Sequence, residues 1–335
     1  MKALRLHGIG DLRLHEEPEP SPGPGEVLVR VSAVGLCGSD LHWFAEGGIG
    51  DAQLTRPLVL GHEFAGTIAS GERRGQRVAV DPAIPCGICE FCQADNPHLC
   101  RTLRFAGHAD EDGALREYVA WPLRCLHPLP DALSDEEGAV LEPLGVALHA
   151  VDLGQVRPGM AVGVFGCGPI GLLVMEAARV AGATCLIATD KIPHRLEAAR
   201  ALGATAVFLA TGGEESAQIL AVTQGRGVDV AIEVAGENEA VETAVAVARP
   251  GGRVVLVGIP AGDRTSFNAS TARRKELAIQ LVRRMKHTYP RAIRLVESGL
   301  VELRPLVTHR FPLSEAGQTF LAARRREGLK VIVAP

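Results

Sequence analysis

The segment from Cys86 to Cys100 contains four cysteines, the inner two being Cys89 and Cys92. Four thiolates at this spacing can surround one tetrahedral zinc ion and leave no coordination position open. Such an ion holds a loop together and performs no chemistry. The spacing therefore predicts a lobe closed by a structural metal, and a reactive metal has to bind elsewhere in the chain.

Disulfides and an iron–sulfur cluster are the alternatives for these cysteines. The chain does not open with a positively charged flank followed by a long apolar run, the pattern of a secretory signal, so we expect a reducing, cytoplasmic location, where disulfides are rare. Iron–sulfur runs of this kind usually continue Cys-x3-Cys-Pro, whereas seven residues separate Cys92 from Cys100, and Arg101 follows. Zinc is the favoured interpretation.

A second set of metal-binding side chains precedes the lobe. Cys37 stands in Gly-Leu-Cys-Gly-Ser-Asp, and His62 and Glu63 follow in Gly-His-Glu-Phe-Ala-Gly. Sulfur, nitrogen and oxygen donors from separated segments can hold zinc and leave a position for substrate. Taken alone, His62 would be interpreted as a hydrogen-bonded structural histidine. The combination favours a catalytic metal.

Length and charge narrow the class of protein. With 335 residues the chain exceeds the usual size of one core, so two domains are expected. A net charge of −4 argues against a nucleic-acid binder. The longest apolar stretch, 162–183, is interrupted by Glu176 and Arg179 and does not indicate a membrane span.

The sequence pattern changes between the first and second halves of the chain. Up to about residue 147, short β runs such as Val27–Val34 alternate with Gly and Pro turns, which predicts a mostly β domain. From about residue 160, apolar runs alternate with helix-length segments, which predicts a doubly wound parallel sheet, an α/β fold. The six expected strands are 162–165, 186–189, 206–209, 228–234, 254–257 and 278–281. We assign 1–148 and 276–335 to the first domain and 149–275 to the second.

A glycine-rich segment follows the first of these strands. It runs from Gly166 through Gly168, Pro169 and Ile170 to Gly171 and then enters an expected helix. Glycines at this spacing permit a tight turn and let the backbone approach a pyrophosphate at the helix N-terminus. The segment alone is weak evidence for a dinucleotide, and its place between a strand and a helix strengthens it.

The acidic residue after the next strand is Asp190. A carboxylate there can accept hydrogen bonds from both ribose hydroxyls and repels a 2′-phosphate, so we expect NAD rather than NADP. A solvated residue or a helix cap is the plain alternative. Lys191 and Arg195 follow and could offset part of the repulsion.

In this order, the motifs at Cys37–His42, Gly61–Glu63, the cysteine lobe, Glu142-Pro-Leu and Gly166–Gly171 resemble the zinc-dependent medium-chain alcohol dehydrogenases over the whole chain. The segments 43–51, 57–63 and 305–312 are most similar to the sorbitol, xylitol and related polyol dehydrogenases. The resemblance implies a GroES-like catalytic domain and a Rossmann domain. Glu72 stands where the family signature expects a small residue, in a turn that is shortened.

The resemblance also implies the ligands of the catalytic zinc. Cys37, His62 and Glu63 are expected to bind it, and Glu142 is either a fourth ligand or a hydrogen-bond partner of a bound water. A helix N-terminal charge is the plain alternative for Glu142. Asp40 is the natural partner that fixes the tautomer of His62, although an Asp in a turn can equally cap a helix.

The remaining implied roles concern proton transfer and binding. Ser39 is expected to carry the proton toward solvent, with His42 as a second relay group or a plain surface histidine. Trp43 and Arg284 are expected to line the substrate pocket; the alternatives are a core aromatic and a solvated charge. Val234, Gly258 and Arg284 are assigned to the cofactor site, since Arg284 could donate hydrogen bonds to the polyol or to the cofactor. Met285 and Lys286 depart from the small polar residues common in polyol enzymes, and Lys286 could favour an acidic or phosphorylated substrate.

Together these expectations describe an enzyme. A Lewis acid such as zinc lowers the pKa of a secondary alcohol, whose carbon then gives hydride to NAD. The leading hypothesis is oxidation of a polyol to a ketose. Other secondary alcohols (L-threonine, 2,3-butanediol or a sugar acid) and a non-enzymatic zinc-and-nucleotide sensor are the alternatives. A homotetramer or homodimer is expected. Cys125, Cys167 and Cys185 are expected to be buried free thiols.

Overall fold

The computed structural model describes all 335 residues, and the chain divides into two compact units. Unit 1 comprises Met1–Glu142 and Tyr289–Pro335, and unit 2 comprises Pro143–Thr288. The boundaries thus differ from the 148/149 and 275/276 of the sequence prediction. One continuous helix, α3 (Asp135–Gly154), runs across the first boundary, and β18 (Ala278–Leu281) belongs to the sheet of unit 2.

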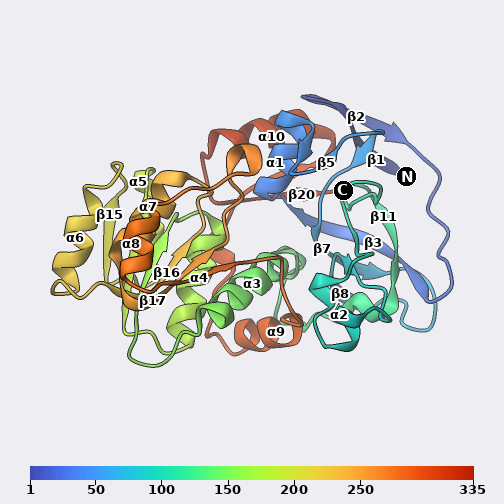
Figure 1. Ribbon diagram of the computed structural model, residues 1–335. Helices are drawn as coiled ribbons and strands as arrows, with labels where there is room; N and C mark the ends of the chain where they lie inside the picture. The colour runs from blue at the N-terminus through green and yellow to red at the C-terminus, as the bar shows by residue number, and fades with distance from the viewer. The chain divides into compact units, whose positions relative to one another are not determined.

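Unit 1 is mostly β, as the sequence predicts (Figure 1). Its main sheet has the order β12-β8-β7-β3-β20-β19, with β11 also paired to β3. The strands of unit 1 are β1 (Lys2–Gly8), β2 (Asp11–Glu16), β3 (Glu26–Gly35), β4 (Gly48–Ile49), β5 (Ala52–Gln53), β6 (Leu58–Val59), β7 (Glu63–Ile68), β8 (Arg77–Val80), β9 (Ala83–Ile84), β10 (Arg104–Phe105), β11 (Tyr118–Pro122), β12 (Leu126–Pro128), β19 (Val307–Pro312) and β20 (Lys330–Ala334). Its helices are α1 (Gly38–Glu46), α2 (Glu90–Gln93), α9 (Tyr289–Glu297) and α10 (Ala316–Arg325).

The sequence of β3 explains its central place in this sheet. Val29 and Val31 point into the core, whereas Arg30 between them is exposed, which is the period of two expected for a strand with one solvated face. The core behind the sheet contains the large side chains Trp43, Phe64 and Trp121. The C-terminal strand β20 pairs with β3 antiparallel, so the end of the chain returns to the first domain as predicted.

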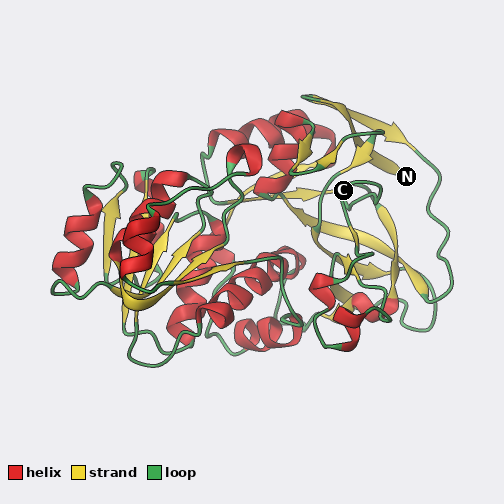
Figure 2. Ribbon diagram, viewed as in Figure 1, coloured by secondary structure: helices red, strands yellow, loops and turns green.

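Unit 2 contains one parallel sheet with the order β15-β14-β13-β16-β17-β18. Figure 2 shows helices on both of its faces. Every residue of β16 is buried, as expected of a parallel strand covered on both sides. Besides α3 and β18, the elements of unit 2 are β13 (Ala161–Phe165), α4 (Pro169–Val180), β14 (Cys185–Asp190), α5 (Pro193–Ala201), β15 (Ala206–Leu209), α6 (Glu215–Val222), β16 (Val228–Glu233), α7 (Asn238–Val247), β17 (Ala248–Leu256) and α8 (Ala269–Arg274).

This topology confirms the predicted doubly wound fold. The strand order reverses between β13 and β16, and ligands of such sheets bind at the carboxyl ends of the strands near that point. The glycine-rich segment follows β13 and so lies at the reversal. No helix in either unit combines the length and the hydropathy that crossing a membrane requires.

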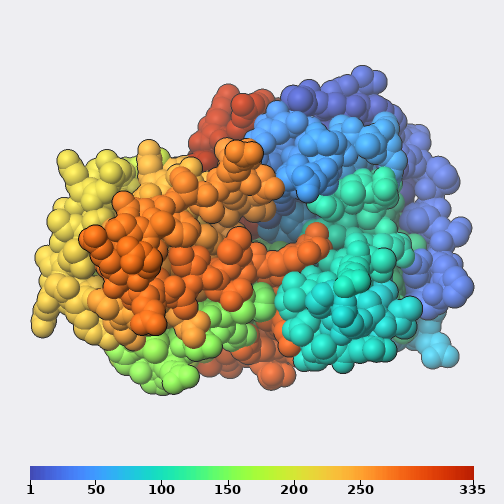
Figure 3. All heavy atoms as spheres, in the orientation of Figure 1, coloured from blue at the N-terminus to red at the C-terminus, as the bar shows by residue number.

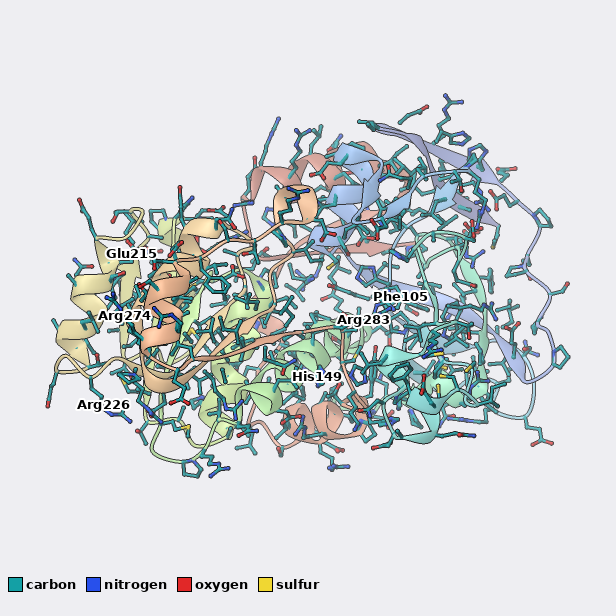
Figure 4. The ribbon with its side chains drawn as sticks, in the orientation of Figure 1. Phe105, His149, Glu215, Arg226, Arg274 and Arg283 are labelled. Carbon is teal, nitrogen blue, oxygen red and sulfur yellow. The ribbon has the colours of Figure 1, made fainter.

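A buried carboxylate in unit 2 leads to a prediction about acid stability. Asp229 on β16 accepts hydrogen bonds from Arg226 (2.6 and 3.0 Å), from Arg249 (2.6 Å) and from the backbone N–H of Ala161 (2.9 Å). Arg226 is labelled in Figure 4. Burial opposes ionisation, but these donors together hold the pKa of Asp229 well below its usual range.

A carboxylate with a depressed pKa stabilises the fold fully at pH values above its unfolded-state pKa of about 3.9. This stabilisation is lost as the pH falls through the folded-state pKa. We expect Asp229→Asn to lower the free energy of unfolding by about 2 kcal/mol at pH 7. The gap in melting temperature between variant and wild type should then narrow as the pH drops below about 4. A gap that is unchanged at low pH would show that Asp229 does not act through its charge.

Candidate metal and cofactor sites

The four cysteines of the lobe meet in the structure. Their sulfur atoms all lie within 4.8 Å of one another, with 3.9 Å between Cys86 and Cys92 and 3.5 Å between Cys89 and Cys92. These separations exceed a disulfide bond, and no disulfide is formed. Sulfurs bound 2.3 Å from one tetrahedral zinc would lie about 3.8 Å apart. The lobe therefore fits the predicted structural zinc.

Backbone donors shape this sulfur cluster. The N–H groups of Cys86 and Cys89 point at the sulfurs of Cys100 (3.3 Å) and Cys86 (3.4 Å), respectively. Hydrogen bonds from the backbone of Ile88 and Cys89 lower the pKa of Cys86 to about 6, whereas desolvation raises the pKa of Cys92 to about 12. Four thiolates so close together need a cation to remain deprotonated. Figure 3 shows the lobe, in teal, on the surface.

The second set also converges within unit 1. Donor atoms of Cys37, His62 and Glu63 lie within 4.8 Å of one another. Cys37 precedes helix α1, and Glu63 begins β7 directly opposite Gly35 of β3. A Cβ atom at Gly35 would lie 2.3 Å from Oε2 of Glu63, so only glycine leaves room for this carboxylate. The strand pairing thus positions the glutamate, and the helix start positions the thiol.

Asp40 lies behind this set and is fully buried. Its carboxylate accepts hydrogen bonds from the backbone N–H groups of Cys37 (2.9 Å) and Gly61 (3.2 Å), and Oδ1 lies 3.5 Å from Nδ1 of His62. Asp40 therefore caps the start of α1 and also faces Nδ1 of His62. The imidazole Nε2 is left for a metal.

This contact predicts an effect on metal affinity. Asp40→Asn should weaken zinc binding at the Cys37 set by roughly 10- to 100-fold, because partners that orient a ligating histidine contribute about that much. Competition with a chromogenic chelator measures it. Asp112→Asn is the matched control, since Asp112 is a carboxylate of the same unit held by Arg5 and Arg56. Equal zinc affinities in the two variants would contradict the role.

Negative charge is concentrated around the set. Asp40, Glu63 and Glu142 are 0–4% exposed, and Lys330 is the only fully buried lysine or arginine in the chain. Burial raises the pKa of Glu142 to about 7, with Glu63 adding to the effect. Burial lowers the pKa of His62, but the charges of Asp40 and Cys37 outweigh burial and hold it well above its ordinary value. His62 and Glu142 therefore tend to hold protons, which offset negative charge that a bound cation would otherwise neutralise.

Three of the residues expected to relay a proton or bind substrate, Ser39, His42 and Trp43, lie on α1 beyond Cys37. Ser39 is half-buried. His42 has a partner at the helix surface, since its Nδ1 lies 3.0 Å from Glu46. Trp43 is 2% exposed and belongs to the core of unit 1, which agrees with the alternative interpretation of Trp43 as a core aromatic residue. Its ring edge nevertheless contacts another ring near the metal set.

That ring belongs to His108; neither His108 nor Phe105 is predicted from the sequence. The centroid of the Phe105 ring lies 5.3 Å from that of His62 and 6.5 Å from that of His108. The ring centroids of His108 and Trp43 are 5.6 Å apart. Phe105 is labelled in Figure 4. The two residues come from the segment after the lobe, which carries no recognisable motif. Its position directly after Cys100 was the only signal available.

In unit 2, the glycine-rich turn has the conformation that the sequence predicts. Gly166 has φ 108°, which favours glycine, and a Cβ at Gly171 would lie 1.9 Å from the carbonyl oxygen of Gly166. Gly168 is the N-cap of α4, and Pro169 and Ile170 form its first turn. The backbone N–H groups at this helix start remain available for a phosphate.

Asp190 lies at the end of β14, next to this turn. Its carboxylate accepts hydrogen bonds from the backbone N–H groups of Cys167 (2.7 Å) and Ile192 (2.8 Å). Nη1 of Arg195 lies 4.0 Å from it, whereas Lys191 forms ion pairs with Glu237 and Glu239. Of the two cations, Arg195 alone is in place to offset the charge of Asp190.

Gly258 lines a pocket of about 230 Å³ in unit 2, together with Glu233 and Leu281. Val234 lies at the glycine turn, since its side chain would be 3.0 Å from a Cβ at Gly171. Arg284 has a left-handed backbone, with φ 56°. Of the three remaining cysteines, Cys125 and Cys167 are buried and Cys185 is half-buried, and all three are free thiols.

Comparison with known proteins decides the family. Residues 23–131 match the alcohol dehydrogenase GroES-like domain, and residues 169–298 match the zinc-binding dehydrogenase domain. The chain belongs to the zinc-dependent medium-chain alcohol dehydrogenases. The sorbitol dehydrogenase of Bacillus subtilis (strain 168) is 37% identical to this dehydrogenase, covering 100% of the chain and 97% of the relative.

Two solved structures have the same fold as this dehydrogenase. The 2R,3R-butanediol dehydrogenase of Bacillus subtilis has a TM-score of 0.89 at 33% identity and covers 100% of this chain and 99% of its own. A protein of Sinorhizobium meliloti 1021, solved bound to NADP, has a TM-score of 0.91 at 34% identity and covers the same shares. The predicted family and fold are confirmed, and an enzyme is favoured over the sensor.

Proposed function

We propose that this dehydrogenase oxidises a secondary alcohol of a polyol such as sorbitol or xylitol to the ketose and transfers hydride to NAD. The observation that carries the proposal is the set of three mixed donors, Cys37, His62 and Glu63, which leaves a coordination position for substrate. Full-length similarity to a sorbitol dehydrogenase supports the substrate class.

Each group of this chain has a distinct task in the proposal. Zinc at the donor set supplies a Lewis acid that lowers the pKa of an alcohol. Cys37, His62 and Glu63 hold it, and Glu142 serves either as a fourth ligand or as a hydrogen-bond partner beside it. Asp40 keeps the proton of His62 on Nδ1, so that Nε2 is free to bind.

Proton release and cofactor binding use neighbouring elements. Ser39 on α1 takes the alcohol proton toward solvent, and His42 follows it one helical turn on, at the surface. The turn Gly166–Gly171 binds the pyrophosphate, and Asp190 binds the adenosine ribose. Val234, Gly258 and Arg284 complete the proposed cofactor site, and Lys191 and Arg195 flank Asp190.

The cofactor assignment predicts the effect of removing Asp190. In Asp190→Ser, the ratio of kcat/KM with NADP to that with NAD should rise at least about tenfold, since 1.4 kcal/mol of lost repulsion suffices. Steady-state NADH and NADPH formation measure it. Glu197→Ser, an exposed carboxylate on α5, is the control and should leave the ratio unchanged. Equal use of NAD and NADP by the wild type would contradict the assignment.

We assign Trp43 and Arg284 to substrate. Two further rings support a polyol site at the metal set, because Phe105 contacts His62 and His108 contacts Trp43. Similarity to a butanediol dehydrogenase makes 2,3-butanediol the second candidate. L-Threonine and a sugar acid, the latter suggested by Lys286, remain further alternatives.

Location and assembly complete the proposal. Eight free thiols, four of them in the lobe, suit the reducing cytoplasm. We propose a homodimer or homotetramer. The edge strand β18, with Leu281 65% exposed, offers a surface for self-association.

The test is an NADH-formation screen of the purified holoenzyme on sorbitol, xylitol, 2,3-butanediol, L-threonine and an aldonate, with and without a zinc chelator. The proposal expects the highest kcat/KM on a polyol and loss of turnover with chelator. Negligible rates on every polyol would remove the leading substrate class. Turnover that survives removal of all zinc would contradict the metal role.

A further inference from the structure

Lys330 is buried against Glu63. The lysine begins β20, its side chain is 3% exposed, and that of Glu63 is 1% exposed. Its Nζ lies 2.8 Å from Oε1 and 2.6 Å from Oε2 of Glu63, and it donates a third hydrogen bond to the carbonyl oxygen of Leu36 at 3.1 Å. An ammonium has three donors, so all of them are used.

The fold places Lys330 at this point by strand pairing. β20 pairs with β3 through Ile332 and Gly35, and Gly35 in turn faces Glu63 across β3 and β7. Taking a lysine out of water is costly unless it is paired and fully hydrogen-bonded. This is the only lysine or arginine in the chain buried to this extent, and its partner is a residue that we assign to the metal.

Glu63 would therefore face two cations once a metal is bound. Its carboxylate belongs to the donor set with Cys37 and His62, and both of its oxygens also contact Lys330. A carboxylate oxygen has lone pairs for both partners, but its charge is shared between them. The ammonium thus competes electrostatically with a metal for Glu63.

We propose that Lys330 is a positioning residue that sets how strongly Glu63 binds the catalytic metal. It holds the carboxylate in place before the metal binds and withdraws part of the carboxylate's charge afterwards. The inference rests on the proposed metal site. It assigns a task to Lys330, a residue of the last strand that acts through the metal-binding residue Glu63 and not on the substrate itself.

A count of charges supports this role. Cys37, Glu63 and Asp40 together carry three negative charges in the pocket when all are ionised, one more than a divalent ion neutralises. Lys330 supplies the missing positive charge before Glu142 is counted. A metal surrounded by less negative charge is a stronger Lewis acid and is held less tightly. Lys330 thus favours activation of the alcohol at the expense of metal affinity.

The test compares Lys330→Met with the wild type in metal affinity as well as rate. Native mass spectrometry at graded chelator concentrations separates chains with two, one and no zinc ions. The variant should retain its second zinc at chelator concentrations at least about tenfold higher, which corresponds to 1.4 kcal/mol. Its melting temperature should fall more without zinc than with zinc, and its kcat should fall.

Three further variants control the comparison. Lys330→Arg keeps the charge and should retain zinc as the wild type does. Adding Lys330→Met to Glu63→Gln should leave the zinc affinity of Glu63→Gln unchanged, because a neutral amide has no charge to share. Lys275→Met removes an ammonium that contacts only backbone carbonyls of unit 2, and it should lower the melting temperature equally with and without zinc.

The outcomes separate this inference from the metal assignment. A wild type that binds only one zinc refutes the metal site itself. Two zinc ions with unchanged affinity in Lys330→Met, or an equal stability loss with and without zinc, overturn the role of Lys330 alone. If Lys330→Met folds only with zinc, the inference is supported. If Lys330→Met does not fold at all, the comparison of Glu63→Gln with and without Lys330→Met decides. If the double variant also fails to fold, the inference is contradicted.

Discussion

Replacing His62 with alanine is expected to lower the rate of NAD-dependent alcohol oxidation roughly a thousandfold. The catalytic set has three donors within 4.8 Å of one another, and the variant leaves a thiolate and a carboxylate to hold the metal. A Lewis acid contributes several kcal/mol to such a reaction, and each 1.36 kcal/mol is a factor of ten in rate. Steady-state NADH formation and zinc content per chain measure the effect.

The control for this variant is His127→Phe. His127 lies in the same unit, stacks on Tyr289 with ring centroids 4.5 Å apart, and burial lowers its pKa to about 4. Phenylalanine preserves the stacking, so both zinc ions and the rate should be retained. A His62→Ala enzyme that keeps more than about a tenth of the wild-type rate would exclude the large Lewis-acid contribution assigned to this set.

Replacing Cys92 with serine should release the zinc of the lobe. Metal binding to such a site is coupled to folding, and in isolated zinc fingers it contributes about 10–16 kcal/mol, an upper bound for a lobe attached to a folded unit. We therefore expect one zinc per chain in place of two, a loss of several kcal/mol in the stability of the lobe, and early proteolysis between Cys86 and Cys100. Limited proteolysis and elemental analysis test this.

Cys125→Ser is the matched variant for the lobe. Cys125 is a buried thiol of the same unit that donates to the carbonyl oxygen of Ala83, and it belongs to neither metal set. It should keep two zinc ions and the wild-type proteolysis pattern. Two zinc ions in Cys92→Ser, or the same loss in both variants, would show that the lobe is not closed by a metal.

The sequence predicts those features that depend on local spacing. The cysteines of the lobe and the turn Gly166–Gly171 each lie within one short segment, so their chemistry is visible without the fold. The parallel strands are predicted because a strand covered on both faces, such as β13, is a short run of apolar residues. A run of apolar residues after Lys330 also locates β20.

Features that depend on distant contacts could not be predicted in the same way. Lys330 is 267 residues from Glu63, and Gly-Leu-Lys-Val-Ile-Val is typical of an ordinary strand start. His108 contacts Trp43 only because the segment after the lobe packs beside α1. The boundary at Glu142 was not predicted because α3 continues across it as one helix, even though Pro143 stands inside the helix at that point.

The most direct test of the account is anomalous diffraction at the zinc edge from crystals of the purified protein. The account predicts two peaks per chain, one among the sulfurs of Cys86, Cys89, Cys92 and Cys100, and one between Cys37 and His62. A single peak in the lobe, with nothing beside His62, would contradict the claim that this chain carries a catalytic metal.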